Sequence, residues 1–181
     1  MPMTNGHAPG ADPAPDYAID LQVDDAYADA VDGMSLLAAV SAALRHCGVG
    51  RAVLSVVVTD DETVRELNRT YRGVDEATDV LSFAAQDDAT EGAPVLPPEA
   101  AAEIEDYLGD ILIAYPYSLR QAARLGVSPA AELRLLVVHG TLHLLGYDHD
   151  TQEAEAEMWA IQEAILERFG DGGLTRQHGE S

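Results

Sequence analysis

The sequence predicts an α+β fold, in which a small mixed four-stranded sheet packs with about five helices. Apolar residues recur with a strand or helix period in the order β-α-β-α-β-β-α-α-α. The chain has 181 residues, of which 47% are hydrophobic, enough for one domain with its own core. One segment, 133–145, is apolar nearly all round, which is typical of a buried helix.

The first half of the chain alternates strands and helices. Residue types that cap helices, Ser35 and Asp60 or Asp61, precede the two helical patterns. A run of β-branched residues between the helices is typical of a buried strand. The expected elements are a strand over 18–23, a helix from 35 to about 47, a strand over 52–58, a helix over about 62–71 and a strand over 79–84.

The second half places three helices after the last strand. Residues 86–106 form a long acidic loop that contains prolines, and 108–115 is the fourth strand. Pro116 fits the first position of a helix that ends near Gly126. The expected remaining elements are a helix that Ser128 and Pro129 begin and Gly146 ends, and an acidic helix over about 151–169.

The ends of the chain and its charge set limits on location and partners. Residues 1–16 are predicted to be a disordered arm, 17–169 a single domain, and 170–181 a flexible tail. No apolar run is long enough for a membrane span, and no secretory signal is recognisable, so the expectation is a cytoplasmic protein without membrane contacts. The formal charge of −22 repels nucleic acid on average. Binding of a polyanion therefore requires a local cluster of arginines or a metal.

The segment 139–149, HGTLHLLGYDH, contains the candidate metal-binding residues. His139 and His143 are four residues apart and therefore share one helix face. Gly146 can take the left-handed conformation that ends the helix and reverses the chain, which brings His149 back beside them. Buried imidazoles need partners, so this pattern predicts a metal site at the end of a buried helix; structurally satisfied histidines are the alternative.

Three neutral nitrogen ligands suit one Zn²⁺ ion per chain, with another divalent transition metal as the alternative. Three protein ligands leave a position for water, which is typical of a catalytic site, and zinc then supplies a nucleophile at neutral pH. Asp110 and Asp148 are candidates to orient a histidine by a hydrogen bond. For Asp148 a role as a turn residue is equally open.

The spacing also matches a zinc-protease pattern, H-E-x-x-H-x-x-G-x-x-H, at every position except one. Gly140 stands where those proteases have the glutamate that acts as general base. The ligand spacing is retained and the peptidase base is missing. A protease-like metallohydrolase therefore stays an alternative that Gly140 argues against.

Arginines line one face of the helix over 62–71 and its exit. Arg65 is best explained as part of a solvated face paired with nearby glutamates. Arg72 follows the helix and precedes a loop and a strand, where it can meet an anion and stabilise the charge of a transition state. Phe83, in the following strand, is interpreted as a core residue rather than a platform for a base.

With these segments in hand, the chain resembles the YbeY family of bacterial ribosomal-RNA maturation endoribonucleases over about residues 17–169. The resemblance is based on LNRTYRGVDEATDVLSF at 67–83, GDILI at 109–113 and HGTLHLLGYDH at 139–149. It implies that His139, His143 and His149 hold a metal, usually zinc, and that Arg72 is needed for activity. It also implies a single-strand-specific endoribonuclease that acts in 16S rRNA 3′-end maturation and ribosome quality control.

The implied partners are single-stranded rRNA, the small ribosomal subunit and its assembly proteins, and no DNA. The chain departs from the family pattern at Gly73–Ala77, where a lysine is frequent, and at Ala84, where a proline is frequent. The loss of positive charge weakens RNA affinity more than chemistry, so a docked ribosomal protein or assembly factor is expected to contribute binding. A non-catalytic, zinc-stabilised ribosome-assembly module remains the non-enzymatic alternative.

Overall fold

The computed structural model describes residues 13–85, 99–100 and 104–175. Its sheet has the order β1-β2-β4-β3, in which β1, β2 and β4 are parallel and β3 is antiparallel to β4. The strands are β1 (Asp16–Val23), β2 (Arg51–Thr59), β3 (Val80–Ala84) and β4 (Tyr107–Ala114). The predicted mixed four-stranded sheet is therefore confirmed.

Five α-helices and a short 3₁₀ turn, η1 (Asp25–Tyr27), complete the described part of the chain. The helices are α1 (Gly33–His46), α2 (Asp61–Arg72), α4 (Tyr115–Leu125), α5 (Pro129–Leu144) and α6 (Gln152–Glu167). Their order is the predicted one, and the sequence pattern did not predict η1. No helix among the described residues is long and apolar enough to cross a membrane.

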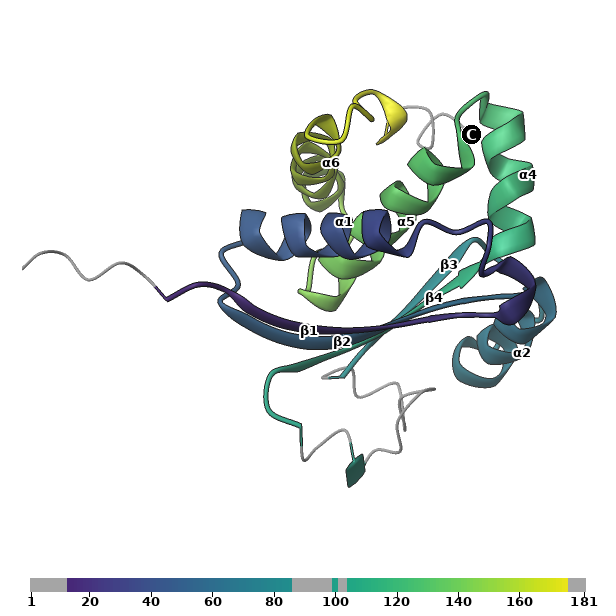
Figure 1. The fold of residues 1–181 in the computed structure, drawn as a ribbon, viewed down its shortest axis with the longest axis horizontal. Helices are drawn as coiled ribbons and strands as arrows, with labels where there is room; N and C mark the ends of the chain where they lie inside the picture. Colours follow the sequence, from purple (N-terminus) through teal and green to yellow (C-terminus); the bar gives the residue numbers. More distant parts are fainter. Residues whose placement is uncertain (1–12, 86–98, 101–103, 176–181) are drawn as a thin grey trace, which may run out of the picture.

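The helices divide between the two faces of the sheet. Figure 1 shows α1, α5 and α6 above the sheet and α2 below it. The main core lies on the α1 and α5 face, where Ile111 and Ile113 of β4 meet the buried residues of α5. A smaller core lies on the α2 face, where Leu112 and Ala114 of β4 contact Val64. Phe83 is buried in this second core, as predicted.

Side-chain caps and a left-handed glycine set the helix limits. Asp60, Ser128 and Thr151 each accept a hydrogen bond from the backbone N–H of the third residue of the next helix. Ser128 was predicted as a cap and Asp60 was one of two candidates, whereas the capping role of Thr151 was not predicted. The prediction for α1 was wrong by one turn: Asp32 is the cap, and it accepts a hydrogen bond from the Ser35 N–H. Gly126 ends α4 in the left-handed conformation.

The domain ends differ from the predicted limits. The prediction of a disordered arm was wrong for Asp16, which pairs with Arg51 in the sheet; residues 1–12 lie outside the described residues. The predicted loop 86–106 also falls mostly outside them. The prediction of a flexible tail was wrong for residues 170–175, because Asp171 forms a buried ion pair with Arg134 and Thr175 is buried.

Candidate functional site

The site is built on α5, the most enclosed helix of the fold. Its residues 131–142 are buried except Arg134 and His139, which are partly exposed. His139 and His143 point from the same helix face, and their Nε2 atoms are 3.0 Å apart. The shared face follows from the four-residue spacing, as predicted.

His149 returns to the same place through the turn after α5. Gly146 has a φ of +97°, a conformation that side chains with a Cβ rarely adopt, and this reverses the chain direction. The His149 ring centroid lies 5.3 Å from that of His143 and 6.2 Å from that of His139, while His139 and His143 are 4.5 Å apart. The predicted gathering of three imidazoles is therefore present.

The electrostatics favour a neutral ring at His143. Burial, together with the neighbouring His139 and His149, lowers the pKa of His143 to about 4. At pH 7 the His143 imidazole is therefore neutral and keeps a nitrogen lone pair.

The donor chemistry fits a soft-to-borderline divalent metal such as zinc. Two nitrogens bound to one tetrahedral zinc lie about 3.3–3.4 Å apart, close to the 3.0 Å between the Nε2 atoms of His139 and His143. The described residues contain no group of three His, Cys, Asp or Glu side chains already arranged to hold an ion. His149, exposed on its turn, is the ring that stands furthest from His139.

A hydrogen-bond chain fixes the orientation of His139. The His139 Nδ1 atom lies 3.0 Å from Gln162 Oε1, and the Gln162 amide donates to Thr175 Oγ1 at 3.0 Å. Because Gln162 uses its nitrogen on Thr175, its oxygen accepts the proton of His139 Nδ1. His139 Nε2 then presents its lone pair toward His143.

Arg72 shares a groove of about 630 Å³ with the three histidines. The Arg72 guanidinium donates to the backbone carbonyl of Ser82 at 2.5 Å and lies 5.3 Å from the centroid of the Phe83 ring. These contacts hold an otherwise exposed side chain over β3, and the other N–H groups remain for an anion. Arg72 is the only arginine among the described residues that line the groove.

The two aspartates that were predicted to orient a histidine do not do so. The prediction for Asp110 was wrong, because it alternates with Ile111 along β4 and faces the α2 side of the sheet, where Tyr107 donates to it. Asp148 lies in the groove, but its carboxylate accepts from the backbone N–H of Asp150, which is the turn role left open above.

Sequence comparisons identify the family. The sequence model described as "Endoribonuclease YbeY" matches residues 22–170. An Endoribonuclease YbeY of Roseiflexus castenholzii is 48% identical over 161 residues, which cover 88% of this chain and 95% of that protein. One of Geobacillus kaustophilus is 46% identical and covers 82% of this chain and 90% of that protein. The chain belongs to the YbeY endoribonuclease family.

A solved structure supports the fold of this YbeY family member. The solution structure of TM1509 from Thermotoga maritima matches with a TM-score of 0.52 and 25% sequence identity. The match covers 82% of this chain and 87% of that protein. The predicted family resemblance and the α+β fold are thus both confirmed.

The structure also explains why the zinc-protease pattern is incomplete in this YbeY chain. Gly140 faces the sheet: a Cβ built there lies 2.9 Å from Ile111 Cγ2 and 3.1 Å from Ser82 Oγ. A side chain at 140 therefore requires Ile111 or Ser82 to shift. Peptidase chemistry by the usual base is therefore excluded at this position.

Sequence reasoning missed Gln162 and Thr175. Both are polar and buried, and both lie beyond the histidine motif, on α6 and in the segment after it. The only signal for Gln162 is a polar residue at a buried position of an amphipathic helix. That signal does not say which imidazole it contacts.

Proposed function

We propose that this chain is a metal-dependent endoribonuclease specific for single-stranded RNA, acting in 16S rRNA 3′-end maturation and ribosome quality control in the cytoplasm. The observation that supports it is one groove that contains Arg72 and all three histidines, although Arg72 is far from them in the sequence. The relatives named above are endoribonucleases by name. The proposed partners are single-stranded rRNA, the small ribosomal subunit and its assembly proteins.

His139, His143 and His149 would hold the metal, with Zn²⁺ as the first choice. When bound, zinc supplies Lewis-acid polarisation of a phosphate oxygen and a lowered pKa of water. Gln162 keeps the His139 Nε2 lone pair directed toward His143. Because the pKa of His143 is lowered to about 4, its imidazole stays unprotonated at neutral pH, and its lone pair is available to a metal.

Arg72 binds the phosphate next to the bond that breaks. A guanidinium donates two parallel hydrogen bonds to phosphate oxygens and stabilises the additional negative charge of the transition state. The contacts of Arg72 with Ser82 and Phe83 orient it before the substrate arrives, which lowers the entropy cost of binding.

The test is cleavage of a labelled single-stranded RNA by zinc-loaded protein, by protein treated with a chelator, and by paired variants. Arg72→Ala is expected to lower kcat/KM by about 10²- to 10³-fold. Arg69→Ala removes the same charge from the same helix outside the groove and is expected to act like wild type. Equal activity of the two variants would contradict the proposal.

A second pair separates catalysis from a merely structural metal. His149→Ala is expected to fold and to lose cleavage, whereas His46→Ala, on α1, keeps both. Unfolding of His149→Ala would favour the non-catalytic assembly module. The product ends identify the nucleophile, since a 2′,3′-cyclic phosphate requires attack by the RNA 2′-hydroxyl.

A further inference from the structure

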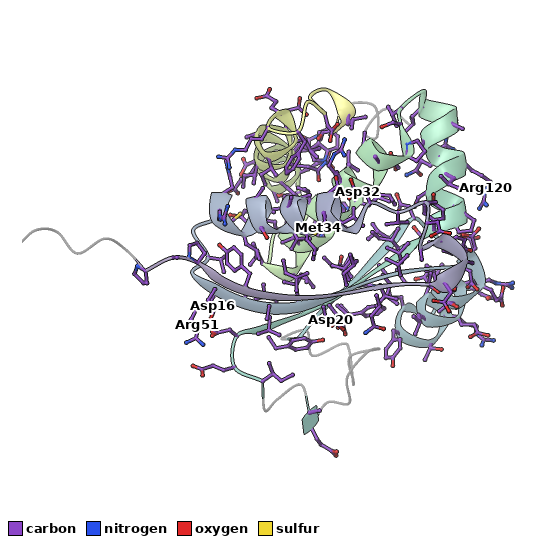
Figure 2. All side chains as sticks on the ribbon, viewed as in Figure 1. Asp16, Asp20, Asp32, Met34, Arg51 and Arg120 are labelled. Atoms are coloured by element: carbon purple, nitrogen blue, oxygen red, sulfur yellow. The ribbon has the colours of Figure 1, made fainter. Side chains whose placement is uncertain are left out.

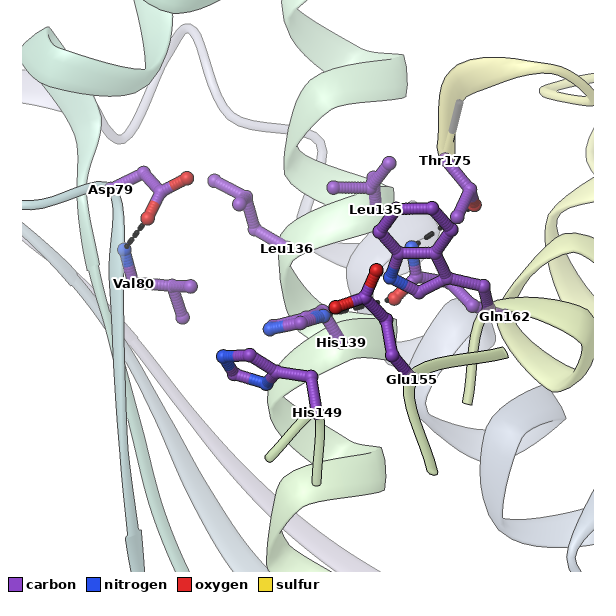
Figure 3. A pocket seen from close by; sticks show the side chains of 10 residues that line it. Asp79, Val80, Leu135, Leu136, His139, His149, Glu155, Gln162 and Thr175 are labelled. Atoms are coloured by element: carbon purple, nitrogen blue, oxygen red, sulfur yellow. Dashed lines mark hydrogen bonds between the residues drawn. The ribbon is translucent and has the colours of Figure 1, made fainter. Parts of the chain in front are cut away.

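A second, smaller cavity of about 230 Å³ opens beside the groove. Four residues line both hollows, so the two are adjacent: Asp79, Val80, His139 and His149. Figure 3 shows Leu135 and Leu136 of α5 along this cavity, with Asp79 and Val80 on one side and Gln162 and Thr175 on the other. A polymer that follows the groove past the histidines can therefore place one of its groups in the cavity.

The apolar walls suit a flat ring. Trp159 of α6, which is half-buried, lines the cavity together with Leu135 and Leu136. Indole is a strong stacking partner for a heterocycle, and aliphatic side chains cover the opposite face well. The volume lies below the range of about 300–1,000 Å³ found for pockets of drug-sized ligands, so it suits one ring system rather than a whole nucleotide.

Apart from the two histidines that it shares with the groove, this cavity offers phosphate no cationic partner among the described residues. Arg72 lines the groove but not the cavity, and no arginine lines the cavity at all among the described residues. Two carboxylates, Asp79 and Glu155, line the cavity. The groove also has carboxylates, from Asp79, Asp148 and Asp150, but it has Arg72 to offset them. Phosphate therefore belongs at Arg72, and a neutral group belongs beside Trp159.

The two carboxylates also favour a base that can donate hydrogen bonds to them. Asp79 Oδ1 accepts from the Val80 backbone N–H and from the Thr78 hydroxyl. Asp79 Oδ2 accepts from the Gln121 amide only, so the carboxylate is held in place and Oδ2 keeps a lone pair for a further donor. Glu155 is half-buried, and its carboxylate has no hydrogen bond or ion pair in the part of the chain that the structure describes. Carboxylates accept from amino groups, which adenine, cytosine and guanine have and uracil lacks.

We propose that the cavity around Trp159 binds one unpaired nucleobase that has an exocyclic amino group, next to the phosphate held at Arg72. This deepens the proposed function and rests on it for the identity of the polymer. A base can enter only when it is unstacked and unpaired, which gives a physical reason for a preference for single strands.

Trp159 is the only tryptophan of the chain, so its fluorescence reports on the cavity directly. The probes are non-cleavable 2′-O-methyl hexamers of adenosine, cytidine or uridine, and an abasic hexamer. Adenosine and cytidine hexamers are expected to quench Trp159 and to bind more tightly than the uridine hexamer. The abasic hexamer is expected to bind without quenching. Equal quenching by all hexamers, or none, would overturn the proposal.

Variants identify the groups involved. Trp159→Ala is expected to weaken adenosine hexamer binding about 5- to 150-fold, measured by anisotropy of a labelled hexamer, while Trp159→Phe keeps most of it. Glu155→Gln is expected to reduce the difference between adenosine and uridine. Glu157→Gln changes the same charge on the same helix outside the cavity and is expected to leave that difference unchanged.

The outcome separates this proposal from the proposed function. If zinc-loaded wild type cleaves RNA and Trp159→Ala and Glu155→Gln bind every hexamer as wild type does, the base pocket is wrong and the nuclease stands. If base-dependent quenching occurs and no metal supports cleavage, the nuclease is wrong and the pocket stands. If Trp159→Ala does not fold, the Trp159→Phe and Glu155→Gln results decide alone.

Discussion

At the residue scale, the hydrogen bond partner of a histidine decides which nitrogen is available. The Gln162 oxygen accepts from His139 Nδ1 because its nitrogen is used on Thr175. The segment after α6 therefore contributes to the site, although it contains no predicted ligand. This is a physical reason why the buried polar pair Gln162 and Thr175 lies behind the groove.

Replacement of Gln162 should weaken metal binding more than it weakens the fold. Gln162→Leu removes the acceptor for His139 Nδ1, so zinc affinity, measured by competition with a chelating dye, is expected to fall about 10- to 100-fold. Gln162→Glu keeps an acceptor and is expected to restore most of the affinity. Gln152→Leu, at the exposed start of α6, is the control. Unchanged affinity in Gln162→Leu would show that Gln162 does not orient the ring.

A substitution of Gly140 is expected to destabilise the fold. Gly140→Ala places a methyl group against Ile111 and Ser82, and the overpacking is expected to lower the free energy of unfolding by about 1–3 kcal/mol. Gly50→Ala is the matched control, since a Cβ there has no neighbour within 4 Å and the backbone has no positive φ. Urea denaturation of both variants measures the difference, and equal midpoints would contradict the close contact.

At the element scale, the limits of what the sequence predicts follow from the range of each interaction. The helices begin where Asp60, Ser128 and Thr151 cap them, and α4 ends at Gly126, because these effects are local to a few residues. The role of Asp110 was predicted wrongly because the helix that covers each face of β4 decides what a side chain on that face can contact. That is decided by α2 and α5, which are distant in sequence.

The ion pair of Arg134 with Asp171 fixes the chain after α6 to α5 and extends the domain past its predicted end. Arg134 Nε lies 2.6 Å from Asp171 Oδ2, and the two side chains are only 16% and 7% exposed. Arg134 also donates to Ser35 Oγ of α1 at 3.0 Å. Three elements therefore meet at one guanidinium, near the start of α1, where Figure 2 labels Asp32.

Breaking this buried pair should destabilise the fold strongly. Asp171→Asn leaves the Arg134 charge buried without its carboxylate, so the free energy of unfolding is expected to fall by about 3–5 kcal/mol. Asp75→Asn, which breaks the exposed pair of Arg65 with Asp75 at 2.9 Å, is expected to cause little change. Thermal unfolding of both variants is the measurement. A similar loss in the two would mean that burial does not distinguish these pairs.

At the scale of the whole molecule, the net negative charge opposes the binding of RNA at the proposed site. The chain has a formal charge of −22, and RNA is a polyanion, so long-range forces repel the substrate. The groove nevertheless contains Arg72 and the three imidazoles. Local contacts, and an assembly partner in the proposed function, therefore have to supply the binding energy.

Salt dependence separates these two effects. Salt screens the long-range repulsion and also weakens the contact of Arg72 with phosphate, so the wild-type curve mixes the two. Arg72→Ala and Arg69→Ala have the same net charge, and the repulsion cancels in their comparison. The slope of log K against log salt for a single-stranded 2′-O-methyl RNA is expected to be more negative by about 0.7 in Arg69→Ala, the value for one phosphate contact. Fluorescence anisotropy at several salt concentrations measures it, and parallel lines for the two variants would show that Arg72 does not bind phosphate.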